Sequence, residues 1–164
     1  MNEAATQETS NRWGGFIEMP RNQVVQIAFL GAVLGFAYWL LTLFLRYVIL
    51  DPLFCADPAS GSCVSSLGNA SNVASVIVAI IGLLGLIRLS VYRPLLIVIA
   101  TMVSLWGLGT WVNDVSWYGA LIASIVLFAL GYVTYSWLVR PRSFPIALII
   151  IVAVVILTRW LPVL

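Results

Sequence analysis

The sequence predicts an all-α, polytopic integral membrane protein. Hydrophobic residues make up 62% of its 164 residues and charged residues only 9%, so the chain cannot cover a water-exposed surface with polar groups. The apolar residues lie in continuous runs of about 20, the length that an α-helix needs to cross a hydrocarbon core of roughly 30 Å. The strands of a membrane barrel would instead alternate over about 10 residues. We therefore expect a bundle of transmembrane helices.

Five apolar runs are expected to form the spans of this bundle. The first run, residues 24–50, would reach roughly 40 Å as a helix, so we expect it to tilt in the bilayer or to project from it. It is too long for the core of a signal peptide, which is about 7–15 residues, and we expect it to be retained. The polar residues 1–23 form the expected cytoplasmic N-terminal segment. The five-helix transmembrane domain covers residues 24–164, with approximate spans at 24–50, 72–91, 94–112, 117–139 and 143–161.

The positions of the arginines predict the orientation of the chain. All eight basic residues are arginine, and six of them lie before the first span, between the second and third, or between the fourth and fifth. The positive-inside rule places these connections in the cytoplasm. The N-terminus is then cytoplasmic and the C-terminus outside, as expected for a protein of the bacterial inner (plasma) membrane. The six residues are Arg12, Arg21, Arg88, Arg93, Arg140 and Arg142.

Two arginines depart from this alternation. Arg46 and Arg159 lie near the outer ends of the first and fifth spans. Because each lies within about 6 Å of the end of its run, its side chain can extend to the lipid headgroups. A second interpretation pairs Arg46 with Asp51 or Arg159 with Asp114, which would form a polar site at the outer end of the bundle. The sequence leaves both interpretations open.

The two cysteines, Cys55 and Cys63, both lie in the predicted outer loop, residues 51–71. The outer side is oxidising, so a disulfide is the expected state, and it would stabilise the fold by about 2–3 kcal/mol through closure of a short loop. Free thiols, an intermolecular bridge and a catalytic thiol pair are the alternatives. A catalytic pair is disfavoured because the spacing is not CxxC and no cation lies close by to activate a thiol.

Small residues spaced four apart predict close contacts between helices. Such pairs place two small side chains on one helix face, where the backbones of two helices can approach each other. The contact can lie within this bundle or at an interface with another subunit. The pairs are Gly31 with Gly35, Ala100 with Ser104, and Ala120 with Ser124.

The residue types that most often perform chemistry are absent from the apolar runs. The sequence has no histidine and no lysine, and no aspartate or glutamate lies inside a run. We therefore expect no catalytic residues, no metal site and no cofactor. The net charge of +2 without a basic tract also gives no reason to expect nucleic-acid binding. Trp39 and Trp106 lie deep enough to line a cavity for an apolar ligand or lipid, although simple packing also explains them.

These observations favour a noncatalytic accessory or structural subunit of a larger membrane complex. Its expected partners are the lipid bilayer and either other membrane subunits or further copies of the chain. The alternative is a small oligomeric transporter or channel with a path between the hairpins 72–112 and 117–161. Both hairpins contain an Arg-Pro dipeptide, Arg93-Pro94 and Arg140-Pro141, as in a weak internal repeat. A thiol-redox enzyme is the third candidate.

Overall fold

The computed structural model describes residues 21–54, 62–91, 93–111, 115–139 and 144–160, and every regular element in these segments is helical. The prediction of an all-α fold is confirmed for this part of the chain. The first helix is continuous and consists of α2 (Arg21–Phe44), a π-helical turn η2 (Leu45–Leu50) and α3 (Asp51–Phe54). The remaining helices are α4 (Ser62–Arg88), α5 (Pro94–Ser104), α6 (Leu108–Trp111), α7 (Trp117–Leu138) and α8 (Phe144–Trp160).

Three helices in the described segments are long and apolar enough to cross a membrane, by length and composition. They cover Asn22–Leu53, Gly68–Arg88 and Trp117–Leu138. Two shorter apolar helices cover Pro94–Ser104 and Pro145–Leu157. The structure thus supports a multi-pass membrane protein, whereas the full set of five spans and the orientation of the chain stay predictions.

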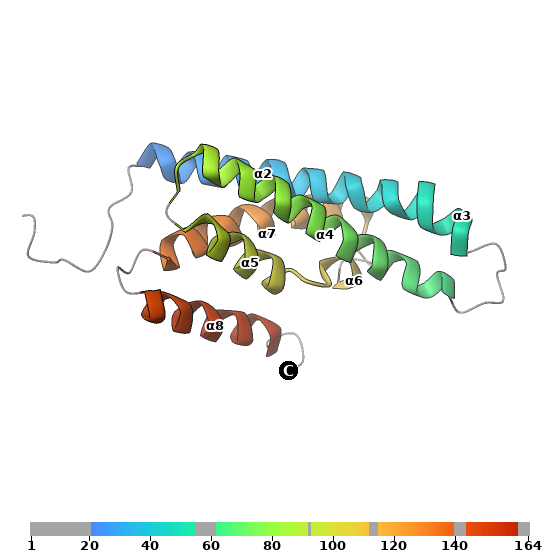
Figure 1. Cartoon of the computed structure of the whole chain (residues 1–164). Helices are drawn as coiled ribbons and strands as arrows, with labels where there is room; N and C mark the ends of the chain where they lie inside the picture. The colour runs from blue at the N-terminus through green and yellow to red at the C-terminus, as the bar shows by residue number, and fades with distance from the viewer. Residues whose placement is uncertain (1–20, 55–61, 92, 112–114, 140–143, 161–164) are drawn as a thin grey trace, which may run out of the picture.

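The helices run up and down in an antiparallel bundle (Figure 1). The start of α2, the connection from α4 to α5, the end of α7 and the start of α8 lie at one end, which we call the Arg88 end. Near it, Gln23 Nε2 of α2 donates a hydrogen bond to the carbonyl of Leu89 at 3.3 Å, which joins the start of α2 to the residue after α4. The opposite end contains η2, α3 and α6, and we call it the Arg46 end.

The third predicted span, 94–112, is not one helix. Helix α5 ends at Ser104, and Gly107 has a φ of 85°, which a right-handed helix cannot include. The intervening turn uses tighter bonds, from Trp106 N to the Val103 carbonyl and from Leu108 N to the Leu105 carbonyl. The apolar composition of this segment gave no sign of the break, because a glycine inside an apolar run is equally compatible with a continuous helix.

The predicted loop 51–71 is also much shorter than expected. The first helix continues through Phe54, and α4 already begins at Ser62 rather than at residue 72. Polar residues can continue the backbone hydrogen bonding of a helix beyond its apolar run. Hydropathy therefore indicates which part of a helix lies in the membrane, and it does not show where the helix ends. At its other end α4 stops at Arg88 rather than at Val91, and Ser90 has a left-handed φ of 52°.

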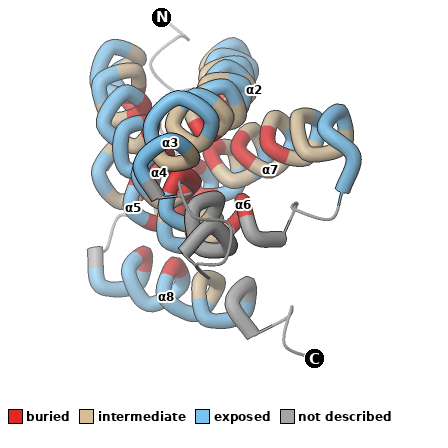
Figure 2. The backbone as a smooth tube through the Cα atoms, turned by 90° about the vertical axis from the view of Figure 1, so that its right-hand side faces the viewer, coloured by how far each residue is buried: buried red, intermediate tan, exposed pale blue. Residues whose placement is uncertain are grey.

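The core lies between α2, α4, α5 and α7. Its largest fully buried side chains include Tyr132, Ile27, Leu34, Leu86 and Ile97. Helix α8 lies at one side of the bundle and packs mainly against α5 (Figure 2), where its buried residues are Ala147 and Ile151. Many large apolar side chains face outward, as is expected of a surface in contact with lipid.

Candidate functional site

Gly31 and Gly35 place the backbone of α2 directly against that of α7. A Cβ atom on Gly31 would lie 2.8 Å from Ala129 Cα, and one on Gly35 would lie 2.5 Å from the Ser124 carbonyl oxygen. A side chain at either position would push the two helices apart, because the atoms that it meets belong to the helix backbone. Helices α2 and α7 accordingly form the most extensive helix pair in the described part of the bundle. The Gly31–Gly35 face is therefore used inside this chain.

The other two small-residue pairs differ from each other in their surroundings. Ala100 and Ser104 are buried, and the Ser104 hydroxyl forms a hydrogen bond with that of Tyr135, which links α5 to α7. On α7 the Ser124 backbone faces Gly35, whereas Ala120 is only half-buried and lines a pocket. The pair Ala120 and Ser124 thus lies at the boundary between the close contact of α2 with α7 and the pocket.

Most hydroxyl groups of the interior donate to a carbonyl of their own helix. These hydrogen bonds are 2.7 to 2.9 Å long and span three or four residues, so each of these hydroxyls satisfies a carbonyl of its own helix. The donors are Ser71 and Ser75 on α4, Thr42 on α2, Thr101 on α5, and Ser124 and Ser136 on α7.

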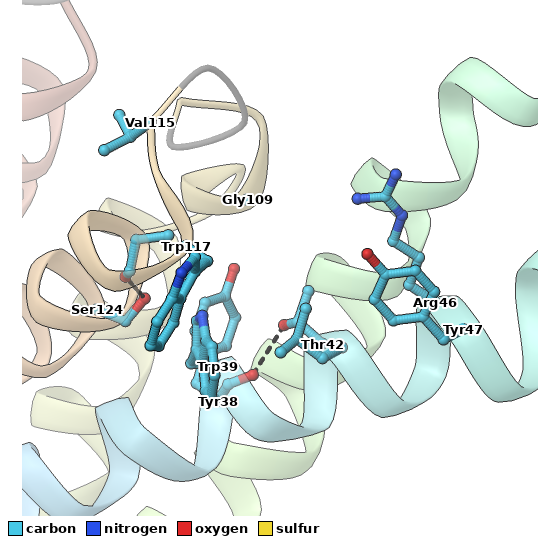
Figure 3. A pocket seen from close by; sticks show the side chains of 11 residues that line it. Tyr38, Trp39, Thr42, Arg46, Tyr47, Gly109, Val115, Trp117 and Ser124 are labelled. Atoms are coloured by element: carbon cyan, nitrogen blue, oxygen red, sulfur yellow. Dashed lines mark hydrogen bonds between the residues drawn. The ribbon is translucent and has the colours of Figure 1, made fainter.

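A pocket of about 190 Å³ opens between α2 and α7 beyond Gly35, towards the Arg46 end (Figure 3). Its walls are mainly aromatic and aliphatic, with Trp39 and Trp117 on opposite helices. The polar side chains in its lining are those of Thr42, Ser124, Arg46 and the tyrosines Tyr38 and Tyr47. The pocket is lined by Tyr38, Trp39, Thr42, Leu43, Arg46, Tyr47, Gly109, Val115, Trp117, Ala120 and Ser124.

Arg46 lies in the π-helical turn at the rim of this pocket. The backbone N–H of Asp51 bonds to the Arg46 carbonyl five residues earlier, which also brings the two side chains together: Arg46 Nε lies 3.9 Å from Asp51 Oδ2. In a regular α-helix, residues three or four apart face each other and residues five apart do not. The guanidinium also lies 5.3 Å from the ring centroid of Tyr47. The structure thus contains the Arg46–Asp51 pair, and its functional role stays a prediction.

Several predicted site residues lie outside what the structure describes. Asp114 and Cys55 fall in segments that are not described, and the side chains of Arg159 and Cys63 are not described within their helices. The second ion pair and the disulfide therefore stay predictions. In the described segments no group of three or more His, Cys, Asp or Glu residues could hold a metal ion.

Sequence reasoning identified Arg46 and Trp39 but did not join them into one site. A usable signal exists, because Trp39, Leu43 and Arg46 follow helical spacing and place a cation on the same face as two large apolar residues. Trp117 is the first residue of α7, and its place beside Trp39 in the pocket lining depends on the packing of α7 against α2. Trp106 does not line this pocket.

Comparisons with known proteins found no relative: no protein-family model matches the chain, and no curated protein or solved structure is significantly similar to it.

Proposed function

We propose that the chain is a noncatalytic accessory or structural subunit of a larger membrane complex. In this proposal it lies in a bacterial inner membrane with its N-terminus in the cytoplasm. The orientation is supported by the grouping of Arg88 and Arg93 at the same end of the bundle as the start of α2, since the positive-inside rule places such an end in the cytoplasm.

The observation that supports a structural role is the way in which the interior uses its polar groups. The hydroxyls of Thr42, Thr101 and Ser124 donate to carbonyls of their own helices, and Ser104 is bonded to Tyr135. Between these groups, glycines bring helix backbones into contact. Such an interior holds the helices in fixed positions, so the outer surface of the bundle is also fixed. A fixed apolar surface allows neighbouring membrane subunits to pack against it.

The test is purification of the native complex from membranes in a mild detergent. A structural subunit should copurify with unrelated chains at a fixed stoichiometry, and that stoichiometry should persist through a second separation step. Recovery of the chain alone and monomeric from native membranes would exclude the proposal. A cytoplasmic N-terminus is tested separately, by the protection of an N-terminal tag from protease added to intact spheroplasts, in which the periplasmic face of the inner membrane is accessible.

One observation favours a second candidate, a small oligomeric transporter or channel. The break between α5 and α6 produces a discontinuous helix, a feature that many transporters place at their substrate site. The helix that follows this break packs closely on α4, since a Cβ atom on Gly109 would lie 2.5 Å from the Cβ atom of Ser71. Flux through liposomes that contain only this protein, purified as a homo-oligomer, would replace the first proposal with the second.

A further inference from the structure

We propose that the pocket at the Arg46 end binds an anionic phospholipid from the adjoining leaflet. The phosphate would lie at Arg46, and the first methylene groups of the lipid would lie against the aromatic and aliphatic residues that line the pocket, Trp39 and Trp117 among them. This site does not depend on whether the chain is a subunit or a transporter.

The first argument is a buried donor without an acceptor. About a third of the Arg46 side chain is exposed, but its Nε atom is buried and has no hydrogen-bond partner among the described residues. The 3.9 Å distance to Asp51 Oδ2 is that of an ion pair and is too long for a hydrogen bond. Buried N–H groups nearly always have an acceptor. A phosphate oxygen becomes that acceptor when the guanidinium turns from Asp51 towards the pocket and exposes its Nε atom, and the guanidinium fork then matches phosphate geometry.

The second argument is the combination of this cation with apolar walls. Leu43, Ala120 and the two tryptophans would contact hydrocarbon and would gain nothing from a small hydrophilic anion. The volume of about 190 Å³ is below that of a typical pocket for a complete ligand, so it holds a part of the lipid only. Trp117 and Tyr47 are largely exposed, which leaves the pocket open to the surrounding bilayer for the remaining acyl chain.

The third argument is the helix geometry at the same place. The π-helical turn Leu45–Leu50 interrupts the regular hydrogen bonding of the first helix, and such turns occur frequently at functional sites. Here the turn places Asp51 beside Arg46 without bringing the two into hydrogen-bond contact. Asp51 therefore acts as a weak competitor for the guanidinium, and a bound phosphate can displace it.

The experiment measures lipid binding by the purified full-length protein in detergent. Native mass spectrometry counts bound lipid, and the thermal unfolding midpoint reports stabilisation, with phosphatidylglycerol, phosphatidylcholine and inorganic phosphate added separately. We expect binding and an increase in the midpoint with phosphatidylglycerol only. Equal effects of phosphatidylcholine would overturn the role of the charge, and equal effects of inorganic phosphate would overturn the assignment of a lipid.

Three charge variants separate lipid binding from the ion pair. Arg46→Gln should weaken phosphatidylglycerol binding about tenfold or more, the loss of one charge-assisted contact. Arg21→Gln removes the same charge at the start of α2, at the opposite end of the bundle, and should leave binding unchanged. Asp51→Asn removes the competing carboxylate and should retain or tighten binding. If Asp51→Asn weakens binding as much as Arg46→Gln does, Arg46 serves the ion pair and the proposal fails. Equal losses in Arg46→Gln and Arg21→Gln exclude it as well.

A further variant tests the site with Arg46 intact, in case Arg46→Gln does not fold. Ala120→Leu extends a side chain into the pocket from α7 and leaves every charge in place. We expect it to reduce phosphatidylglycerol binding about as strongly as Arg46→Gln, and undiminished binding would place the lipid elsewhere.

Discussion

Helices α2 and α7 meet in two different ways along their length. At Gly31 and Gly35 their backbones are in contact, so that even one added methyl group would lie 2.5 to 2.8 Å from a backbone atom. Beyond Gly35 the same two helices border a pocket whose lining includes Trp39 and Trp117. Figure 2 shows α7 running obliquely away from the other helices towards its exposed end. The change from closed to open occurs within about one helical turn of α2.

The difference shows that side-chain size decides where helices in a lipid environment close and where they open. Lipid is as apolar as the helices are, so association depends on van der Waals packing and interhelical hydrogen bonds. Glycine permits close van der Waals packing along the closed stretch, and the tryptophans prevent backbone contact along the open one. The open stretch is also where Arg46 lies. The two stretches therefore have different tolerance to substitution.

The largest effect is expected at the closed stretch, for Gly35→Ala. The new methyl group meets the Ser124 carbonyl, so we expect a loss of about 1–3 kcal/mol in the free energy of unfolding. The control is Gly119→Ala, where the methyl group meets the side chain of Val115, which is exposed and can rotate. Unfolding in mixed micelles measures both variants. Equal stability of the two would show that the closed stretch is not held by backbone contact.

A smaller effect is expected for the hydrogen bond between Ser104 and Tyr135, which extends the closed region to α5. Ser104→Ala and Tyr135→Phe should each lower the free energy of unfolding, with a coupling of about 0.6–1 kcal/mol in a double-mutant cycle, as is usual for bonds between membrane helices. Additive effects of the two substitutions would mean that the hydroxyls do not bond to each other.

The smallest effect is expected at the open stretch, for Ala120→Leu without added lipid. Because the larger side chain extends into an existing pocket, the free energy of unfolding should change by less than about 0.5 kcal/mol. Unfolding in mixed micelles, as for Gly35→Ala, measures this change in free energy. A loss as large as that of Gly35→Ala would erase the distinction between the closed and open stretches.

Part of the candidate site could be predicted from the sequence. The GxxxG pair Gly31 and Gly35 and the outlying Arg46 are visible in it, since each departs from an otherwise uniform apolar run. The partner of the glycines could not be found, because many small residues occur in the other runs. The π-helical turn that joins Arg46 to Asp51 has no sequence signature, and Trp117 reaches the pocket only through the angle of α7.

By itself the sequence determined that the chain is helical and apolar enough for a membrane. Long apolar runs enter lipid, where no water is present to bond to the backbone, and a helix satisfies the backbone hydrogen bonds within the run. The sequence also determined the approximate position of most helices. Only the tertiary structure decided that the third run breaks at Gly107, that α2 closes on α7, and that a pocket follows. These features depend on which side chains of distant segments meet, and hydropathy contains no information about that pairing.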